Sequence, residues 1–245
     1  MPNGPYQHGT PYPLPALAFL LALAAGALAA LVLMFSSGMW LPASTVPVLA
    51  WCVVAVISES TAVYLPRSNI HVSSTEAVIM AAYLGVGLAG AMAAALCATL
   101  LYVSYDEGRI ESVFNTRLRL TMFNCSHYMV ILLAVRFVYL LLGGKDPSAG
   151  ALQPALVPAI VAAPLFFLLS CILNAWFYKL EEGRPFIQYL KDDLVRHMPT
   201  AFMVSLAAAL VAVAYSMAGI MAIALFALPL MLTRLSILAP PEEWQ

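Results

Sequence analysis

The sequence predicts an all-α fold, a polytopic integral membrane bundle of about seven transmembrane helices. Hydrophobic residues make up 63% of the 245 positions, charged residues make up 9%, and the mean hydropathy is +0.91. A soluble domain carries about 25% charged residues. Because so few polar side chains cannot cover a folded chain in water, we expect the lipid bilayer to be its solvent.

Five apolar runs are each long enough for a spanning helix, which needs about 20 residues. They cover residues 14–35, 46–65, 74–103, 118–142 and 154–178. A last run, residues 200–235, would form one helix of about 54 Å, whereas the hydrocarbon core is only about 30 Å thick. We therefore expect a break at Tyr215–Gly219 that gives two short spans, and seven in all.

The predicted spans belong to one domain. Its limits are an N-terminal tail (1–13), a single transmembrane helical domain (14–237) and a C-terminal tail (238–245). Before the last run, apolar residues recur at helical spacing, at Ile187, Leu190, Leu194 and Met198. This pattern is typical of an amphipathic helix in the membrane interface, and it fits a helical extension of the next span equally well.

The lysines and arginines predict the orientation of a multi-pass protein of the cell membrane. With seven spans, eight of these residues fall on one side, and Arg67 and Lys145 fall on the other. Because basic residues favour the cytoplasmic side, we expect the N-terminus outside and the C-terminus in the cytoplasm. A rival layout also has seven spans, because it splits the third run at its glycines and keeps the last run as one tilted helix. With the C-terminus in the cytoplasm, this layout would put eight of the basic residues outside and two inside.

Composition and motifs argue against several functions. The net charge of −1 offers no basic face to nucleic acid. The four cysteines lie in apolar runs without CxxC spacing, so we expect buried thiols rather than disulfides or a metal site. Serine-hydrolase, zinc-protease and paired Asp-rich motifs were sought and not found, so neither an enzyme nor a cofactor is predicted.

Three ionisable residues lie deep in the apolar runs, where a charge costs about 2.5–3.5 kcal/mol on insertion scales. They are Glu59, His127 and Arg136. Glu59 and Arg136 are expected at similar depth in the outer half, where the guanidinium can bind the carboxylate. Such a pair either fixes the register of two helices or anchors a charged or zwitterionic ligand.

A second polar group lies in the fourth run. Asn124 and His127 are three residues apart and share a helix face, with Ser126 in the same turn. This face can bind a small polar ligand or hydrogen-bond a neighbouring helix. Asn174, near the end of the fifth run, can complete a polar cluster with Asn124.

The polar stretch between the second and third runs raises a further hypothesis. Glu59 and Glu76 flank a loop, residues 65–74, that carries Arg67 and His71. We interpret this loop as an outward lid over a cavity between the spans. The predicted ligand-binding residues are therefore Glu59, Arg67, Glu76, Asn124, His127, Arg136 and Asn174, and no metal ligands are predicted.

Glycines and alanines crowd the third run, where Gly85, Gly87 and Gly90 precede a series of alanines. Small residues allow helix backbones to approach closely in membranes. We expect ordinary helix packing here, and a homodimer through this face is the alternative.

Three segments, in this order, resemble a known bacterial module. ISESTAVYLPRSNIHVSSTEAVIMAAYLGVGLAGAMAA has an acidic residue, Leu-Pro, a polar loop and an apolar helix with a central glycine. RLRLTMFNCSHYMV has an arginine-rich start and a Phe-Asn pair, and YSMAGIMAIALFALPLMLTRLS has a glycine, a Pro-Leu pair and an arginine. The series is similar to the membrane-embedded N-terminal module of HD-type and HD-GYP phosphohydrolase signalling proteins, over residues 45–237.

The same series also resembles the S components of energy-coupling-factor vitamin transporters. That resemblance implies a six-helix core that captures a small vitamin or metal ion from outside. Together the two resemblances imply a bacterial inner-membrane protein.

Three functions follow as hypotheses. The first is a sensor module that binds a small molecule or lipid and acts on a cytoplasmic signalling domain. The second is a solute-binding subunit that works with a transporter partner, and the third is a structural scaffold. The lipid bilayer is an expected partner in each, and a nucleic acid is expected in none.

Overall fold

The computed structural model describes residues 13–36, 45–65, 70–72, 74–106, 109–145, 156–183 and 185–227. Helices dominate this part of the chain, which confirms the predicted helical fold. Within it, four helices are long and apolar enough to cross a membrane: Leu14–Ser36, Thr75–Leu101, Leu118–Leu141 and Val157–Glu182. The chain is therefore compatible with a helical membrane protein, whereas the seven-span count finds no support.

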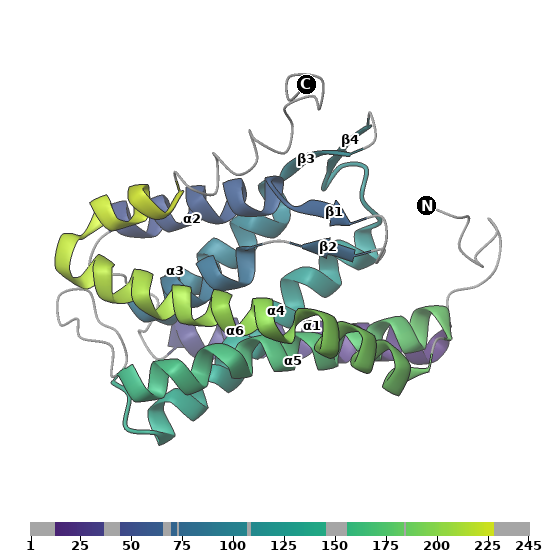
Figure 1. The fold of residues 1–245 in the computed structure, drawn as a ribbon. Helices are drawn as coiled ribbons and strands as arrows, with labels where there is room; N and C mark the ends of the chain where they lie inside the picture. Colours follow the sequence, from purple (N-terminus) through teal and green to yellow (C-terminus); the bar gives the residue numbers. More distant parts are fainter. Residues whose placement is uncertain are drawn as a thin grey trace.

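Six helices and two β-hairpins follow one another along the chain (Figure 1). The helices are α1 (Leu14–Ser36), α2 (Thr45–Ser60), α3 (Thr75–Leu101), α4 (Leu118–Leu141), α5 (Leu156–Glu182) and α6 (Phe186–Ala218). The strands are β1 (Val63–Leu65), β2 (Ile70–Val72), β3 (Val103–Asp106) and β4 (Arg109–Ser112). Each hairpin is antiparallel, with Tyr64 opposite His71 in the first and Asp106 opposite Arg109 in the second.

Helix α3 reverses direction at Gly87, which has φ 83° and ψ −177°. Side chains other than hydrogen are strongly disfavoured in this conformation, because it is essentially restricted to glycine. A straight helix of 27 residues would be about 40 Å long. The two arms, residues 75–86 and 88–101, are instead about 18 and 21 Å long.

Hydrogen bonds place both ends of α3 at the same end of α2. Ser74, just before α3, shares a hydrogen bond of 2.7 Å between its Oγ and that of Ser58. Val103, just after α3, donates its backbone N–H to Ser60 Oγ over 3.0 Å. Because Ser58 and Ser60 are two residues apart, the two ends of α3 lie close together.

A pair of thiols supports the same geometry. Cys52 of α2 and Cys97 of α3 lie close enough to interact electrostatically and through a side-chain hydrogen bond. If α3 ran straight from Ser74, Cys97 would lie about 25 Å beyond Cys52 along the helix axis. The returning arm brings it back beside α2.

The reversal corrects the predicted layout. The single third span is wrong, and the split at the glycines, which belonged to the rival layout, is confirmed at Gly87. As a result, the β1–β2 and β3–β4 hairpins lie at the same end of the bundle instead of on opposite sides of a membrane (Figure 1).

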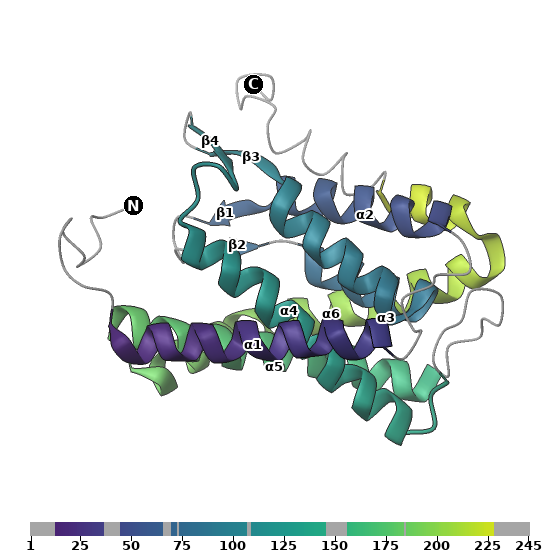
Figure 2. The ribbon, with the colours of Figure 1, turned by 180° about the vertical axis from the view of Figure 1, so that it is seen from behind.

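A second reversal follows α6, at Gly219, which has φ 58°. Residues 220–227 form a further helical segment that turns back toward α2, and Figure 2 shows the same course from behind. This confirms the break predicted at Tyr215–Gly219, and the single tilted helix of the rival layout is wrong. Counting both breaks, the described residues form eight helical segments.

Helix α6 is continuous from Phe186 to Ala218. Of the two interpretations offered for the amphipathic segment 184–198, the extension of the next span is therefore the one observed. At 33 residues, α6 is about 50 Å long.

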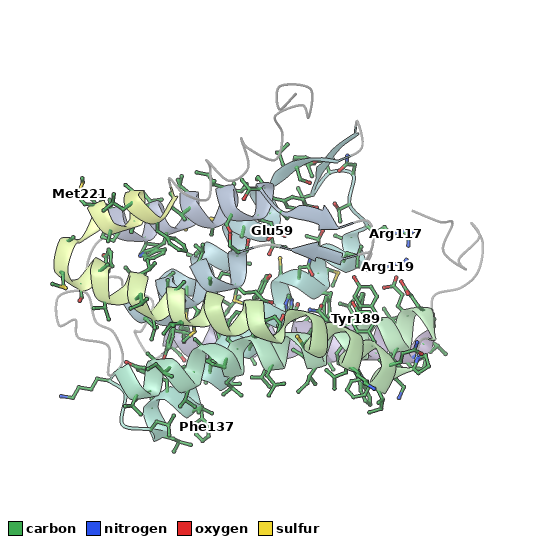
Figure 3. All side chains as sticks on the ribbon, viewed as in Figure 1. Glu59, Arg117, Arg119, Phe137, Tyr189 and Met221 are labelled. Carbon is green, nitrogen blue, oxygen red and sulfur yellow. The ribbon has the colours of Figure 1, made fainter. Side chains whose placement is uncertain are left out.

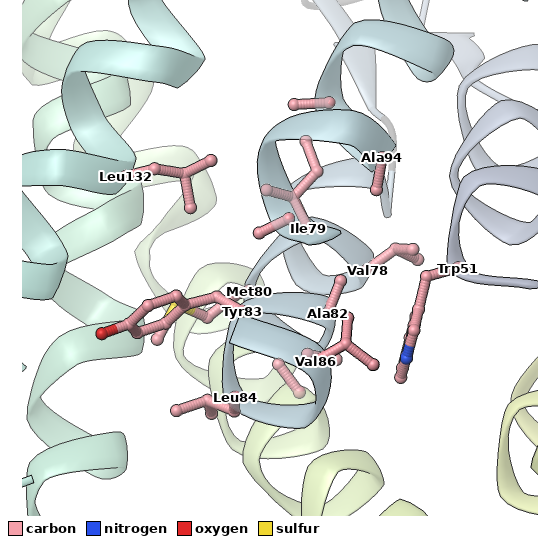
Figure 4. Packing of buried hydrophobic residues seen from close by; sticks show 14 of the residues in the cluster. Trp51, Val78, Ile79, Met80, Ala82, Tyr83, Leu84, Val86, Ala94 and Leu132 are labelled. Atoms are coloured by element: carbon pink, nitrogen blue, oxygen red, sulfur yellow. The ribbon is translucent and has the colours of Figure 1, made fainter. Parts of the chain in front are cut away.

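The α3 hairpin is the centre of the hydrophobic core. Figure 4 shows Val78, Ile79 and Tyr83 of its first arm packed between Trp51 of α2 and Leu132 of α4. Ala94 of the second arm lies at the level of Val78 and Ile79 in the same view. Non-helical backbone is tolerated at membrane depth only where protein surrounds it, and this burial provides that environment for Gly87.

The glycine and alanine face of α3 is used inside the chain. Ala91, Ala94 and Ala95 are fully buried. A Cβ atom on Gly90 would lie 2.4 Å from Val86 Cγ2, so this glycine makes room across the hairpin. These residues pack inside the chain, as expected for ordinary helix packing, and the homodimer stays a prediction.

Helix α1 presents a wide apolar face to the outside. Its buried residues recur every three or four positions, at Ala16, Leu20, Leu23, Ala27, Ala30 and Met34. Leu21, Leu28 and Val32 between them are more than half exposed. In water this face would be unfavourable, so its exposure fits contact with lipid.

Candidate functional site

Hydrogen bonds join polar side chains of α3 and α5 inside the bundle. Ser170 donates its hydroxyl to Glu76 Oε1 over 2.5 Å. Asn174, one turn further along α5, donates its Nδ2 to Ser170 Oγ over 3.4 Å. Ser170 is 1% exposed and Glu76 is half-buried, so the carboxylate is held where water is scarce.

Tyr128 of α4 brings a second carboxylate into this group. The charges of both Glu59 and Glu76 act on its hydroxyl. We call Glu59, Glu76, Tyr128, Ser170 and Asn174 the carboxylate cluster. Its members come from α2, α3, α4 and α5, so it forms only when four helices are assembled.

Local sequence explains how each side chain is placed. Glu59 lies in the last turn of α2. Glu76 lies in the first turn of α3, and the dipole of α3 favours a negative charge at that position. The Ser58–Ser74 hydrogen bond holds these two helix ends together. Ser170 and Asn174 are four residues apart and therefore share a face of α5.

The carboxylate cluster has the chemistry of a site for a small cation. Its groups offer carboxylate, hydroxyl and amide oxygens. In a medium of low dielectric constant, two neighbouring carboxylates repel each other strongly, and a positive charge between them relieves the repulsion. A protonated amine fits this set, since it donates several hydrogen bonds to oxygen.

His127 lies at the edge of this cluster, because the centre of its ring is 4.0 Å from that of Tyr128. It is buried, its Nδ1 lies 3.2 Å from the carbonyl oxygen of Phe123, and its ring stacks on Phe123 at 4.9 Å. Phe123 stacks in turn on Phe177 of α5 at 4.2 Å. These contacts pack His127 between helices, and both His127 and Asn124, half-buried on the same helix, stay predicted binding residues.

Arg136 lies further along α4 than the carboxylate cluster. It follows Tyr128 by eight residues, which is about 12 Å along the helix. Figure 3 shows Phe137, the next residue, at the far end of the molecule from Arg117 and Arg119, with Glu59 between these two ends. The Glu59–Arg136 pair stays a prediction, and Glu59 shares its level of the bundle with Glu76 and Tyr128 instead.

The other loop predictions fall partly outside the described residues. Arg67 lies outside them, as does the tip of the loop 65–74 interpreted as a lid. His71 is on β2, opposite Tyr64. Asn174 does join a polar cluster, but its partner is Ser170 of its own helix.

Sequence reasoning missed Tyr128, Ser170 and one ion pair. Arg119, at the start of α4, contacts Glu181, at the end of α5, with 2.7 Å between Nη2 and Oε1. Glu181 is buried, so the pair fastens these helix ends together. The ion pair could have been predicted, because opposite charges stand at the facing ends of two consecutive spans. Ser170 could not, because a serine in an apolar run does not indicate a polar site.

In the part of the chain that the structure describes, no group of three or more His, Cys, Asp or Glu side chains is arranged to hold a metal ion. The resemblances to the signalling module and to the S components stay hypotheses. No protein-family model matches the chain, and no curated protein or solved structure matches it either.

Proposed function

We propose that the protein is a membrane-embedded sensor module whose carboxylate cluster binds a small molecule with a positively charged amine. The observation that supports it is the hydrogen-bonded group of Glu76, Ser170 and Asn174, which the Ser58–Ser74 hydrogen bond brings near the end of α2, where Glu59 lies. Ionisable residues inside membrane bundles commonly serve function, because their burial is costly. A zwitterionic ligand is also compatible, since polar donors on α5 can reach its negative group.

The orientation is part of this proposal. One end of the bundle, which we call the basic end, contains both β-hairpins, the start of α4 and the α5–α6 turn. Three contacts connect these segments: Ser60–Val103, Tyr102–Thr116 and Arg119–Glu181. Arg117 and Lys179 are exposed there, while Lys145 lies beyond the opposite end of α4. The positive-inside rule then places the basic end in the cytoplasm.

This orientation differs from the one predicted from the sequence. The first half of α1 packs on the basic end, where Leu20 and Leu23 contact Phe123 and Phe177. The start of α1 is therefore proposed to face the cytoplasm, not the outside. The reason is the α3 hairpin, which adds one more change of direction than a straight helix would.

A ligand can act on the cytoplasmic end through short connections. Glu59 directly follows Ser58 and Glu76 lies two residues after Ser74, the two serines that are hydrogen-bonded to each other; β1 and β2 link these two helix ends. A ligand that draws the two carboxylates together therefore biases the position of the β1–β2 hairpin. A cytoplasmic signalling partner at the basic end would read this shift.

A solute-binding transport subunit is the alternative, and the interrupted helix α3 favours it. Transporters often bind solutes at breaks in their helices. Here Glu76 precedes the break at Gly87 by 11 residues, about 16 Å along the helix. The polar groups are therefore not at the break, which is why we place the sensor first.

The proposal is tested by ligand-dependent stability of the purified protein. Ethylammonium and methylammonium, both protonated amines, are compared with acetate in a thermal unfolding assay. We expect the amines to raise the midpoint, since a ligand at 100 times its Kd stabilises by about 2.7 kcal/mol, and acetate to leave it unchanged. The effect should disappear in Glu59→Gln combined with Glu76→Gln and persist in Glu182→Gln. Equal shifts in both variants would refute the site.

Uptake separates the two functions. Reconstituted vesicles that accumulate a bound amine together with a transporter partner would establish the transport alternative and overturn the sensor.

A further inference from the structure

The corner between α5 and α6 carries a group of aromatic side chains. Trp176 and Phe186 meet edge to face at 5.4 Å, and Tyr178 stacks on Tyr189 at 5.0 Å. Gly183, with φ 70°, makes the turn between the two helices. These contacts fix the corner as a defined surface at the basic end, where Figure 3 shows Tyr189 close to Arg119.

The outer side of this corner is exposed and carries a cation. Lys179 Nζ lies 4.7 Å from the centre of the Trp176 ring. Both side chains are exposed, and Ile187, which follows Phe186 in α6, is 70% exposed. The ring holds the ammonium group in one place while its N–H donors still face outward.

The length of α6 places this corner at the headgroup level. The helix is about 50 Å long, but the hydrocarbon core is about 30 Å thick. The apolar run within α6 begins only at about residue 200 and extends toward its other end. The first turns of α6 therefore leave the hydrocarbon core, and tryptophan and tyrosine are enriched at this level.

The charges around the corner leave a positive excess. Among the side chains that the structure describes here, Lys179, Lys191, Arg117 and Arg119 are basic, and Glu181 and Glu182 are acidic. Glu181 is already paired with Arg119. A lipid headgroup with a negative charge is complementary to this surface, because its charge matches the basic residues and its acyl chains match the exposed apolar side chains.

We propose that the α5–α6 corner binds an anionic glycerophospholipid. The lipid phosphate accepts hydrogen bonds from Lys179, and its glycerol and upper acyl chain cover Trp176 and Ile187. Lys191, which is also exposed on the first part of α6, adds a second positive charge. The site is separate from the carboxylate cluster, so it stands whether or not that cluster binds an amine.

Native mass spectrometry of the full chain tests the proposal, with phosphatidylglycerol and phosphatidylcholine added separately to the detergent-solubilised protein. We expect Lys179→Gln to weaken phosphatidylglycerol binding at least five-fold and to leave phosphatidylcholine binding unchanged. Lys179→Arg, which keeps the charge and the ring contact, should restore binding. Lys145→Gln is the matched control, because it removes the same charge at the opposite end.

Two results would overturn the proposal. One is an equal loss of phosphatidylglycerol binding in Lys145→Gln, which would indicate a nonspecific charge effect. The other is unchanged binding in Lys179→Gln. The unfolding midpoint of each variant is measured alongside, and Trp176→Leu provides a second probe that removes the ring but keeps the charge. If Trp176→Leu keeps full affinity for phosphatidylglycerol, the lipid does not bind over the Trp176 ring as proposed.

Discussion

At the scale of single residues, the placement of Glu76 depends on a side chain with no charge of its own. Ser170 donates to the carboxylate and accepts from Asn174, so it connects two polar groups inside an apolar interior. Hydrogen bonds to charged groups contribute about 1.5–3 kcal/mol, and more is lost when a buried acceptor keeps no replacement. A small substitution at Ser170 should therefore change the stability of the protein measurably if the carboxylate cluster is formed.

Replacing Ser170 by alanine should lower the free energy of unfolding by about 1.5–3 kcal/mol, because Glu76 loses a donor in a buried place. Titration of the protein in mixed micelles with increasing SDS measures this change. Ser216→Ala is the control, since Ser216 donates only locally, to the Val213 carbonyl at 2.6 Å, and it should cost under about 0.5 kcal/mol. Equal costs for the two variants would contradict a special role of Ser170.

At the scale of helices, the shape of α3 depends on one glycine. Gly87 has a backbone conformation in which an L side chain is strained by about 1–3 kcal/mol. Gly26 of α1 offers a contrast: a Cβ there would meet Val130 at 3.6 Å, an ordinary contact. Two glycines in apolar helices thus have different physical roles.

Gly87→Ala should destabilise the protein by about 1–3 kcal/mol, whereas Gly26→Ala should be neutral or stabilising by up to about 1 kcal/mol, because alanine favours a helix. Both are measured by the same SDS titration. A neutral Gly87→Ala would mean that α3 does not turn at this residue.

The hairpin also makes a covalent prediction. Oxidation with copper phenanthroline should join Cys52 and Cys97 in a disulfide, since their thiols are neighbours. Mass spectrometry of proteolytic peptides identifies the cross-link, and Cys97→Ser should abolish it. Recovery of Cys52 and Cys97 without a cross-link, while other cysteine pairs react, would argue for a straight α3.

At the scale of the whole molecule, the two reversals decide which loops share a side of the membrane. The basic end collects both β-hairpins, the start of α4 and the α5–α6 turn. Figure 3 shows Arg117, Arg119 and Tyr189 together at this end, with Met221 and Phe137 at the other. Because basic residues favour the cytoplasmic side, this charge distribution supports the orientation proposed above.

Cysteine labelling from the two sides of the membrane tests this arrangement. In a background without the native cysteines, His71→Cys and Phe114→Cys should react with an impermeant maleimide from the same side, and Lys145→Cys from the opposite side. Phe114 is 95% exposed, so its position is well suited to labelling. Opposite sidedness of residues 71 and 114 would restore a straight third span.

The sequence by itself determined the class of this protein. Hydropathy and run length predicted apolar helices. The last run is too long for one helix to span the bilayer, and this predicted the break that is confirmed near Gly219. It also singled out Glu59, Glu76 and Asn174, because polar groups in apolar runs stand out by their cost. These are properties of one segment and its solvent, and a sequence displays them directly.

Only the tertiary structure decided the direction of α3 and the members of the carboxylate cluster. A glycine among alanines fits a straight packed helix and a turn equally well, and the choice depends on the contacts of Ser74, Val103 and Cys97 with α2. Likewise, Tyr128 and Ser170 become functional candidates only beside Glu76. Contacts between distant segments depend on how the helices assemble around each other, which hydropathy along one chain does not encode.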